Sequence, residues 1–539
     1  GMVYLLYIVY IAKIHELMMN IISEIKDFPV DWPGVLGGLA RAHGGRVAVT
    51  DRSGSVSFND LLARAVALAR QMQRAGLLPG EPVVTLIENS REAVFASFAI
   101  ALCGACEVTL NPAQSADEHV WCSSVVGPRA LLHDGRTEVL PPLHVPVIDC
   151  TALPADVPPL GQMPDQLVAA SATDWGRILF TSGTTARPKG VVHTHRGRWI
   201  ACDLLRKSIA PLPDGGSTLL VTPFSHGASL IAYALLLEGA PIHLLQGFDP
   251  AVLVPLIRDG DVRHVFAPPT VLNKLVDLFD GEKVTGLRTI FTGTAPMSAP
   301  LYAAASRIFG PCVRVTYGMS EIFNPITVLE PHACEQAYRQ LGEGAVGLVG
   351  DAPASVQVSI RDEQGVAVAA GASGQIFVRA PHIYAGYLHG QGQFEAAPSE
   401  HPTGDIGEMH GDFGLRILGR MYDTIKTGGY KVLPQEIEAA LRERGVDGEL
   451  VILGLASEYW GEVITCARVA EDDRWIESVR LAAEPISRYK QPRLFVTLPE
   501  LWKNAIGKVD RRRVREYIAA KFVLRDGSHP SLLPRARES

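Results

Sequence analysis

The residues from Thr181 to Gly190 have the types and the spacing of a phosphate-binding loop. Hydroxyl side chains, an arginine and a lysine lie close together in the order Thr-Ser-Gly-Thr-Thr-Ala-Arg-Pro-Lys-Gly. Small residues let backbone N–H groups approach an anion, and hydroxyl and cationic side chains complete such a site. Apolar residues on both sides predict a strand, a tight loop and a second strand. The expected chemistry is the binding of a nucleotide triphosphate, and an ordinary surface turn is the alternative.

The residue after the lysine excludes a Walker A loop. That motif needs Ser or Thr directly after its lysine, whereas Lys189 is followed by Gly190. The order Ser-Gly-Thr-Thr-x-x-Pro-Lys-Gly instead resembles the phosphate loop of the adenylate-forming superfamily. This superfamily includes acyl-CoA synthetases, firefly luciferase and the adenylation domains of peptide synthetases. Ala186 stands where its members usually have glycine.

Six further segments resemble the same superfamily, in the same order, over nearly all of residues 30–515. They begin at Pro223, Gly293, Tyr317, Thr403, Gly419 and Asn504. The resemblance implies that Tyr317 offers an aromatic face to adenine, that Ser320 lies near the α-phosphate, and that Glu321 binds Mg²⁺. It also implies that Asp405 binds the ribose diol and that Arg420 contacts ribose and phosphate.

The resemblance supplies a full set of candidate site residues. The residues expected to bind ATP or to line the thiol tunnel are Thr181, Ser182, Gly183, Thr184, Thr185, Lys189, Gly293, Thr294, Ala295, Tyr317, Gly318, Ser320, Asp405, Arg420, Gly428 and Gly429. Those expected to take part in catalysis are Lys508, Thr184, Glu321 and His226, with Glu321 and Thr184 as the Mg²⁺ ligands. Lys508 is expected to bridge the acid and the α-phosphate.

The segment Pro223–Ser229 is expected to border the acid pocket. His226, Gly227 and Ala228 lie in it, and Met319 is the fourth residue expected to line the pocket. No acidic residue lies between Thr222 and Leu237. An α-ammonium group would therefore be buried without a partner, at a cost of several kcal/mol. We expect a carboxylic acid substrate without an α-amine.

The resemblance implies two half-reactions, with ATP, Mg²⁺ and coenzyme A as cofactors. A fatty or aromatic acid would form acyl-AMP and pyrophosphate, and the thiol of coenzyme A would then take the acyl group. Loading of an acyl carrier protein is one alternative, and an adenylate-binding protein without activity is another. Between the two half-reactions the family rotates its small domain at a hinge, where this chain has Tyr422 followed by Asp423.

The elements that would position these residues follow an α/β pattern. Short apolar runs alternate with amphipathic helices such as residues 61–73, which predicts largely parallel sheets covered on both faces. We expect a large domain over residues 30–420, whose last part, from about 345, is a distorted antiparallel, barrel-like unit. A small mobile α+β domain is expected over 421–525. Residues 1–29 form an N-terminal extension, and the polar tail, 526–539, is expected to fray, as is the chain after Val523.

The bulk composition excludes several function classes. The 539 residues carry a net charge of −7 and no long basic tract, so no nucleic-acid partner is expected. The apolar stretch over residues 2–12 is too short to span a bilayer and is not patterned as a signal peptide. The 8 cysteines suggest a reduced cytoplasmic protein, and the Cys103 and Cys106 pair is interpreted as buried and structural. His193 and His195 are interpreted as structural residues on one strand. The sequence leaves the oligomeric state open.

Overall fold

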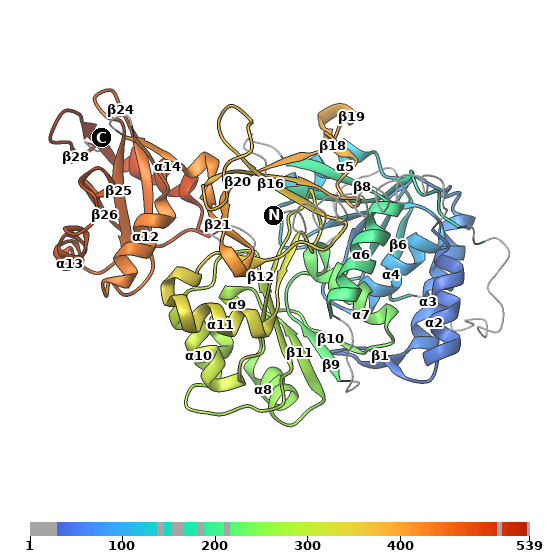
Figure 1. The fold of residues 1–539 in the computed structure, drawn as a ribbon. Helices are drawn as coiled ribbons and strands as arrows, with labels where there is room; N and C mark the ends of the chain where they lie inside the picture. The colour runs from blue at the N-terminus through green and yellow to red at the C-terminus, as the bar shows by residue number, and fades with distance from the viewer. Residues whose placement is uncertain are drawn as a thin grey trace, which may run out of the picture.

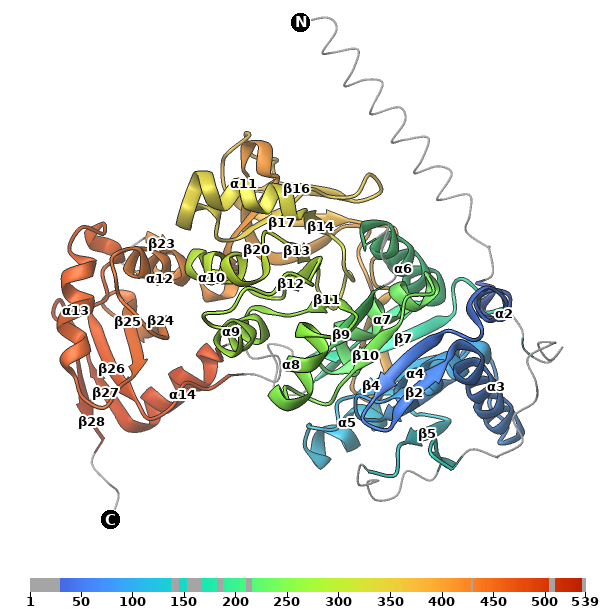
Figure 2. The ribbon, with the colours of Figure 1, turned by 90° about the horizontal axis from the view of Figure 1, so that it is seen from below.

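The computed structural model describes most of the chain from Val30 onward. The described residues are 30–136, 145–152, 167, 169–181, 188–209, 216–427, 430–503 and 509–535. Two large sheets and a third, smaller one make up the part before residue 421, and a separate α+β unit follows (Figures 1 and 2). The mixed α/β class predicted from the sequence is confirmed, including the change to antiparallel strands after residue 345.

The first large sheet has a parallel centre with one antiparallel strand at each edge. In spatial order it contains β14 (Thr327–Leu329), β13 (Val313–Tyr317), β12 (Thr289–Gly293), β11 (Val262–Phe266), β9 (Ser217–Leu220), β10 (Ile242–Leu244), β1 (Val47–Asp51) and β2 (Gly54–Ser57). The carboxyl ends of parallel strands meet at one edge of a sheet, where α/β proteins bind ligands. Two candidate site residues, Gly293 and Tyr317, end the neighbouring strands β12 and β13 at that edge.

The second large sheet contains the strands on both sides of the predicted phosphate loop. In spatial order it contains β19 (Gln393–Ala396), β18 (Gly386–His389), β8 (Lys189–Thr194), β7 (Trp175–Thr181), β4 (Cys106–Leu110), β3 (Pro82–Leu86), β5 (Ala130–His133) and β6 (Val147–Asp149). β7 and β8 pair in antiparallel fashion, with Thr181 opposite Lys189. The two strands predicted on either side of the loop are therefore confirmed.

Helices cover both faces of the two large sheets. The helices before residue 345 are α2 (Trp32–His43), α3 (Phe58–Arg74), α4 (Arg91–Leu102), α5 (Ala116–Val126), α6 (His195–Ile209), α7 (Ser229–Leu237), α8 (Pro250–Arg258), α9 (Pro269–Leu278), α10 (Ala299–Phe309) and α11 (Pro331–Leu341). The largest apolar cluster takes side chains from both sheets and from α2, α3, α4, α6 and α7. α3 shows why the sequence forms a helix here: Ser57 and Asp60 form a capping box, and its apolar face is buried.

Two further units complete the fold. The antiparallel sheet contains β15 (Leu348–Gly350), β21 (Leu415–Arg420), β20 (His401–Met409), β17 (Gly374–Arg379) and β16 (Gln357–Arg361). The C-terminal unit contains β22 (Ile425–Thr427), β23 (Tyr430–Val432), α12 (Pro434–Glu443), β24 (Leu450–Ser457), β25 (Gly461–Val469), α13 (Arg474–Ala483), β26 (Leu494–Leu498) and α14 (Arg511–Lys521). It has its own apolar clusters on both faces of its sheet.

Two expectations about local structure are wrong, and the burial predicted for Cys103 and Cys106 is confirmed. His195 does not share a strand with His193, because it begins α6. The chain does not fray at Val523: β27 (Phe522–Arg525) and β28 (Ser531–Pro534) form a hairpin. Backbone hydrogen bonds between these two strands order the segment, although the composition of the tail is polar. All 8 cysteines are buried and free. No helix within the described residues could cross a bilayer.

Candidate active site

Three candidate residues from distant segments meet at the carboxylate of Asp405. Tyr317 Oη, at the end of β13, donates to Asp405 Oδ2 at 2.5 Å. Arg420 lies opposite Asp405 in the ladder between β20 and β21, and its Nε is 2.7 Å from Asp405 Oδ1. Burial raises the pKa of Tyr317 well above its usual value, and the Asp405 charge raises it further, so this hydroxyl stays a donor. The family resemblance implies that these three residues share a site, and the structure brings them together.

The turn after β12 lies beside this group. Gly293 is opposite Thr316 in the ladder between β12 and β13, and a Cβ on Gly293 would lie 2.4 Å from the Thr316 carbonyl oxygen. Only glycine fits there without a shift of the backbone. Thr294 has φ of +69°, a left-handed conformation that is rare for a β-branched residue. Backbone strain of this kind is concentrated at functional sites.

The loop after Tyr317 is held by a histidine on the strand that leaves the phosphate loop. His193 on β8 donates through Nε2 to the Ser320 carbonyl oxygen at 2.7 Å, and its ring stacks on Phe323 with centroids 3.8 Å apart. Burial lowers the pKa of His193 to about 3, so the ring is neutral. The hydrogen bond and the stacked ring give His193 a structural role in this loop. That role connects two of the candidate motifs.

Glu321 and Lys189 meet across a tyrosine that the sequence analysis missed. Tyr387 on β18 donates its hydroxyl to Glu321 Oε1 at 2.7 Å, and Lys189 Nζ lies 3.3 Å from the centroid of its ring. Burial lowers the pKa of Lys189, and the charge of Glu321 opposes that shift. The contact arises because β18 pairs with β8, with Tyr387 opposite Val191. No local pattern in the sequence signals that pairing.

Several predicted site residues lie outside the described residues. These are Ser182, Gly183, Thr184, Thr185, Ala186, Gly428, Gly429 and Lys508. Their flanks are described: β7 and β8 bound the predicted phosphate loop, and Lys503 pairs with Val509 around residues 504–508.

The segment predicted to border the acid pocket, Phe224–Ala228, is a π-type turn that leads into α7 and is kinked at His226, whose φ of −116° and ψ of −143° are not helical. Such turns are rare and often mark functional sites. Asn89 holds its start: Nδ2 donates to the Thr222 carbonyl at 2.8 Å, and Oδ1 accepts from Phe224 N at 2.7 Å. Burial lowers the pKa of His226, and a nearby arginine, Arg177, lowers it further, so His226 is neutral at pH 7.

The end of β21 connects the site to the C-terminal unit. Arg420 ends β21, and three residues later Asp423 forms an ion pair with Arg511 at 3.3 Å. Arg511 also binds Glu438 on α12 at 2.6 Å. α14 starts at Arg511, three residues after Lys508. The ion pair of Asp423 therefore connects the segment after β21 to the helix that follows the predicted catalytic lysine.

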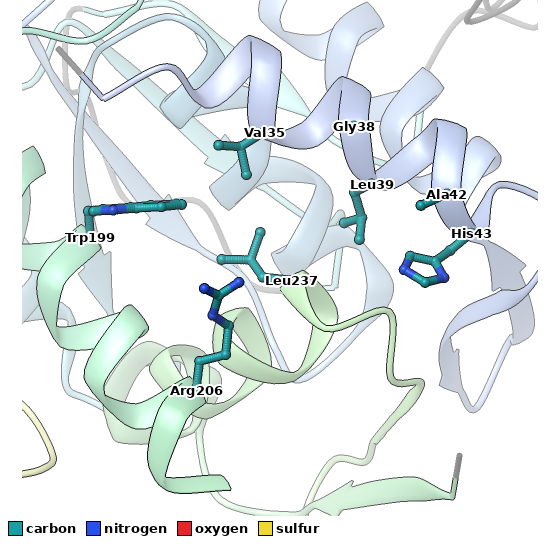
Figure 3. Close-up of a pocket in the computed structure, with 8 residues that line it drawn as sticks. All are labelled: Val35, Gly38, Leu39, Ala42, His43, Trp199, Arg206 and Leu237. Atoms are coloured by element: carbon teal, nitrogen blue, oxygen red, sulfur yellow. The ribbon is translucent and has the colours of Figure 1, made fainter. Parts of the chain in front are cut away.

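A hollow elsewhere on the molecule does not belong to this site. It lies between α2, α6 and α7, where Trp199, Arg206 and Leu237 face α2 (Figure 3). Arg206 is paired with Asp203 and Glu238. None of the candidate site residues lines this hollow.

Known proteins resemble this chain in sequence and in fold. A 2-succinylbenzoate–CoA ligase of Geobacillus kaustophilus is 28% identical over 489 residues, covering 88% of this chain and 95% of the relative. The same enzyme of Listeria monocytogenes is 28% identical over 343 residues, covering 63% and 69%. The solved o-succinylbenzoate CoA synthetase of Bacillus subtilis, in complex with an acyl-adenylate intermediate, superposes with a TM-score of 0.77. It is 23% identical and covers 91% of this chain and 98% of that one, which establishes a shared fold.

The family model provides the assignment. The model described as AMP-binding enzyme matches residues 39–388, which is more than half of the chain and contains every candidate motif before Asp405. Five candidate site residues lie after this range, and two of them, Asp405 and Arg420, join Tyr317 in one group, in which Asp405 contacts both of the others. The chain therefore belongs to the AMP-binding enzyme family.

Proposed function

We propose that this enzyme converts a carboxylic acid and MgATP to acyl-AMP and then transfers the acyl group to coenzyme A. The observation that carries the proposal is the convergence of Tyr317, Asp405 and Arg420 beside the pair Glu321 and Lys189. The first group offers an aromatic ring and a carboxylate for adenosine. The second offers a carboxylate and a cation for the phosphates. Coenzyme A is the proposed acceptor because relatives that match 88% of this chain are CoA ligases.

In the first half-reaction, an oxygen of the acid attacks the α-phosphorus, and the bond from that phosphorus to the pyrophosphate oxygen breaks. Lys189 and the loop from Thr181 would bind the departing pyrophosphate, and Lys508 would offset charge as the carboxylate approaches the phosphate. The described hydrogen bond of the Glu321 side chain uses Oε1, and carboxylate oxygens such as its Oε2 are of the ligand type that Mg²⁺ prefers. Bound there, Mg²⁺ would neutralise phosphate charge.

In the second half-reaction, the thiol of coenzyme A attacks the acyl carbon, and the bond between that carbon and the AMP oxygen breaks. Residues 421–525 are the proposed lid, which would rotate about Tyr422 and Asp423 between the two steps. The ion pair between Asp423 and Arg511 would hold one of the two orientations. A cytoplasmic location is proposed, since all 8 cysteines are free thiols.

A screen for acid-dependent pyrophosphate release tests the function. We favour aromatic acids, because the relatives act on 2-succinylbenzoate. The screen would compare 2-succinylbenzoate and benzoates with fatty acids and amino acids, first with ATP alone and then with coenzyme A or an acyl carrier protein. We expect pyrophosphate release only when an acid is present, and we expect a thioester of coenzyme A to form afterwards. Strong turnover of an amino acid would contradict the proposed pocket at His226.

Asp405→Asn is expected to weaken ATP binding by roughly 10- to 100-fold. Asp405 is proposed to accept hydrogen bonds from the ribose hydroxyls, and the substitution removes its charge; hydrogen bonds to charged groups contribute about 1.5–3 kcal/mol each. Calorimetric titration with ATP would measure the effect. Asp412→Asn, at an exposed position between β20 and β21, is the matched control. Equal affinities of both variants for ATP would argue against a ribose site at Asp405.

Tyr387→Phe is expected to lower the affinity for MgATP by about tenfold, the upper end for one hydrogen bond of ordinary strength. The ring beneath Lys189 stays, but Glu321 loses its hydroxyl donor and is no longer fixed in orientation. Titration of Mg²⁺ into the complex with ATP should show the loss, whereas the remote, exposed Tyr459→Phe should bind like the wild type. An unchanged Mg²⁺ dependence would show that Tyr387 does not orient Glu321.

A further inference from the structure

Three charged side chains lie inside the core between the second large sheet and helices α4, α6 and α7. They are Glu107 on β4, Arg177 on β7 and Arg198 on α6, each at most 3% exposed. Arg198 Nη2 is 2.7 Å from Glu107 Oε2, and Arg177 Nη1 is 3.6 Å from the same oxygen. One carboxylate against two guanidinium groups leaves a net charge of +1.

The two arginines differ in how their donors are used. Arg198 donates to Ser97 Oγ at 3.0 Å and to the Gly176 carbonyl at 3.4 Å, and it lies 4.5 Å from the centroid of the Tyr233 ring. Nε and Nη2 of Arg177 have no hydrogen-bond partner among the described residues. These two nitrogens share one edge of the guanidinium plane. That edge is the fork that binds both oxygens of a carboxylate.

Two donors of the buried Arg177 guanidinium, Nε and Nη2, are available to an anion. Leaving a buried charged donor without a partner costs more than leaving a neutral one, and Glu107 is already bound by Arg198 at the shorter distance. Histidine rings that interact with these arginines do not alter this charge count, because burial lowers the pKa of His193 to about 3, that of His195 to about 4 and that of His226 below its usual value. The free edge of Arg177 therefore suits a two-oxygen anion.

Arg177 lies in the part of the core next to the proposed acid pocket. Arg177 is paired with Glu107, and two residues further along these strands Thr109 is paired with Leu179. Residues two apart in a strand share a face and lie about 7 Å apart. Thr109 Oγ1 donates to the carbonyl of Ser225, the residue before His226, at 2.9 Å. α7, which follows His226, brings Tyr233 to the charged cluster.

We propose that Arg177 binds a second carboxylate of the acid, so that the substrate is a dicarboxylic acid. One carboxyl group would react near His226, and the other would bind Nε and Nη2 of Arg177, with several bonds between them. This inference rests on the proposed adenylation at that pocket and narrows its substrate class. Arg177 would then be a specificity residue that contacts substrate away from the reacting atoms.

The test compares acids that differ only in the second carboxylate. Adipate with hexanoate and terephthalate with 4-methylbenzoate are suitable pairs, measured by kcat/KM for acid-dependent pyrophosphate release. The wild type is expected to favour the dicarboxylate of at least one pair by about tenfold or more, since sites built for a polar group reject analogues without it. Arg177→Met should abolish that preference. Arg177→Lys keeps the charge but loses the fork, and should reduce the preference.

Tyr233→Phe is the matched control, because it removes a hydroxyl from the same cluster and leaves the fork intact. It should keep the wild-type preference, and thermal melting would confirm that each variant is folded. If Arg177→Met does not fold, the ratio for Arg177→Lys decides. A wild-type preference for monocarboxylates, or a ratio that survives the substitution of Arg177, would overturn the inference. Absence of release with every acid would contradict the proposed function itself, and the inference with it.

Discussion

Lys508→Ala is expected to slow acyl-AMP formation by roughly 100- to 1000-fold, the usual effect of losing one preorganised electrostatic contact. Two anions, the acid and the α-phosphate, approach each other in that step, and Lys508 is the residue proposed to offset their charge. Transfer of the acyl group from supplied acyl-AMP to coenzyme A has no such encounter and should be retained. Rapid-quench assays of the separate half-reactions would measure both rates.

A lysine near the same loop provides the control for that substitution. Lys503 precedes residues 504–508 and forms an ion pair with Glu449 at 2.6 Å, with its side chain 35% exposed. Lys503→Ala should change adenylation little, because exposed pairs contribute about 1 kcal/mol or less. If Lys508→Ala slowed both half-reactions equally, the proposed rotation of the C-terminal unit would be contradicted.

Glu107→Gln is expected to lower the free energy of unfolding by about 3–5 kcal/mol, as is typical when one partner of a buried ion pair is removed. Burial alone would raise the pKa of Glu107, but Arg177 and Arg198 hold it below its usual value, so this carboxylate is charged. Its loss would leave two guanidinium groups buried without an opposing charge. Denaturant unfolding followed by circular dichroism would measure the change.

The control for that prediction is an exposed pair of similar geometry. Glu282 lies 2.6 Å from Arg258, with both side chains at least 40% exposed. Glu282→Gln should lower the unfolding free energy by about 1 kcal/mol or less. Similar losses in both variants would show that burial does not amplify the cost at Glu107.

The predictions that succeeded rest on local signals. The apolar runs around Thr181 and Lys189 predicted two strands, and they pair as a hairpin. The helix over residues 61–73 was visible from its spacing, and the structure extends it to Phe58–Arg74, where Ser57 caps it. The convergence of Tyr317, Asp405 and Arg420 could be expected only from the family resemblance, because 88 residues separate the first two.

The features that were missed depend on pairings between distant segments. Tyr387 reaches Glu321 because β18 joins the second large sheet rather than the antiparallel unit that surrounds it in sequence. Asn89 is separated from Phe224 by 135 residues, and nothing near Asn89 indicates that contact. The tail hairpin was missed because composition reports polarity but does not report a partner strand.

Oxygen transfer from the acid to AMP tests the central claim most directly. The acid would be labelled with ¹⁸O at its carboxyl group, incubated with the enzyme, ATP and coenzyme A, and the products analysed by mass spectrometry. Attack on the α-phosphorus, followed by cleavage between the acyl carbon and oxygen, predicts one ¹⁸O in AMP. Unlabelled AMP, or label in orthophosphate, would contradict adenylation at this site.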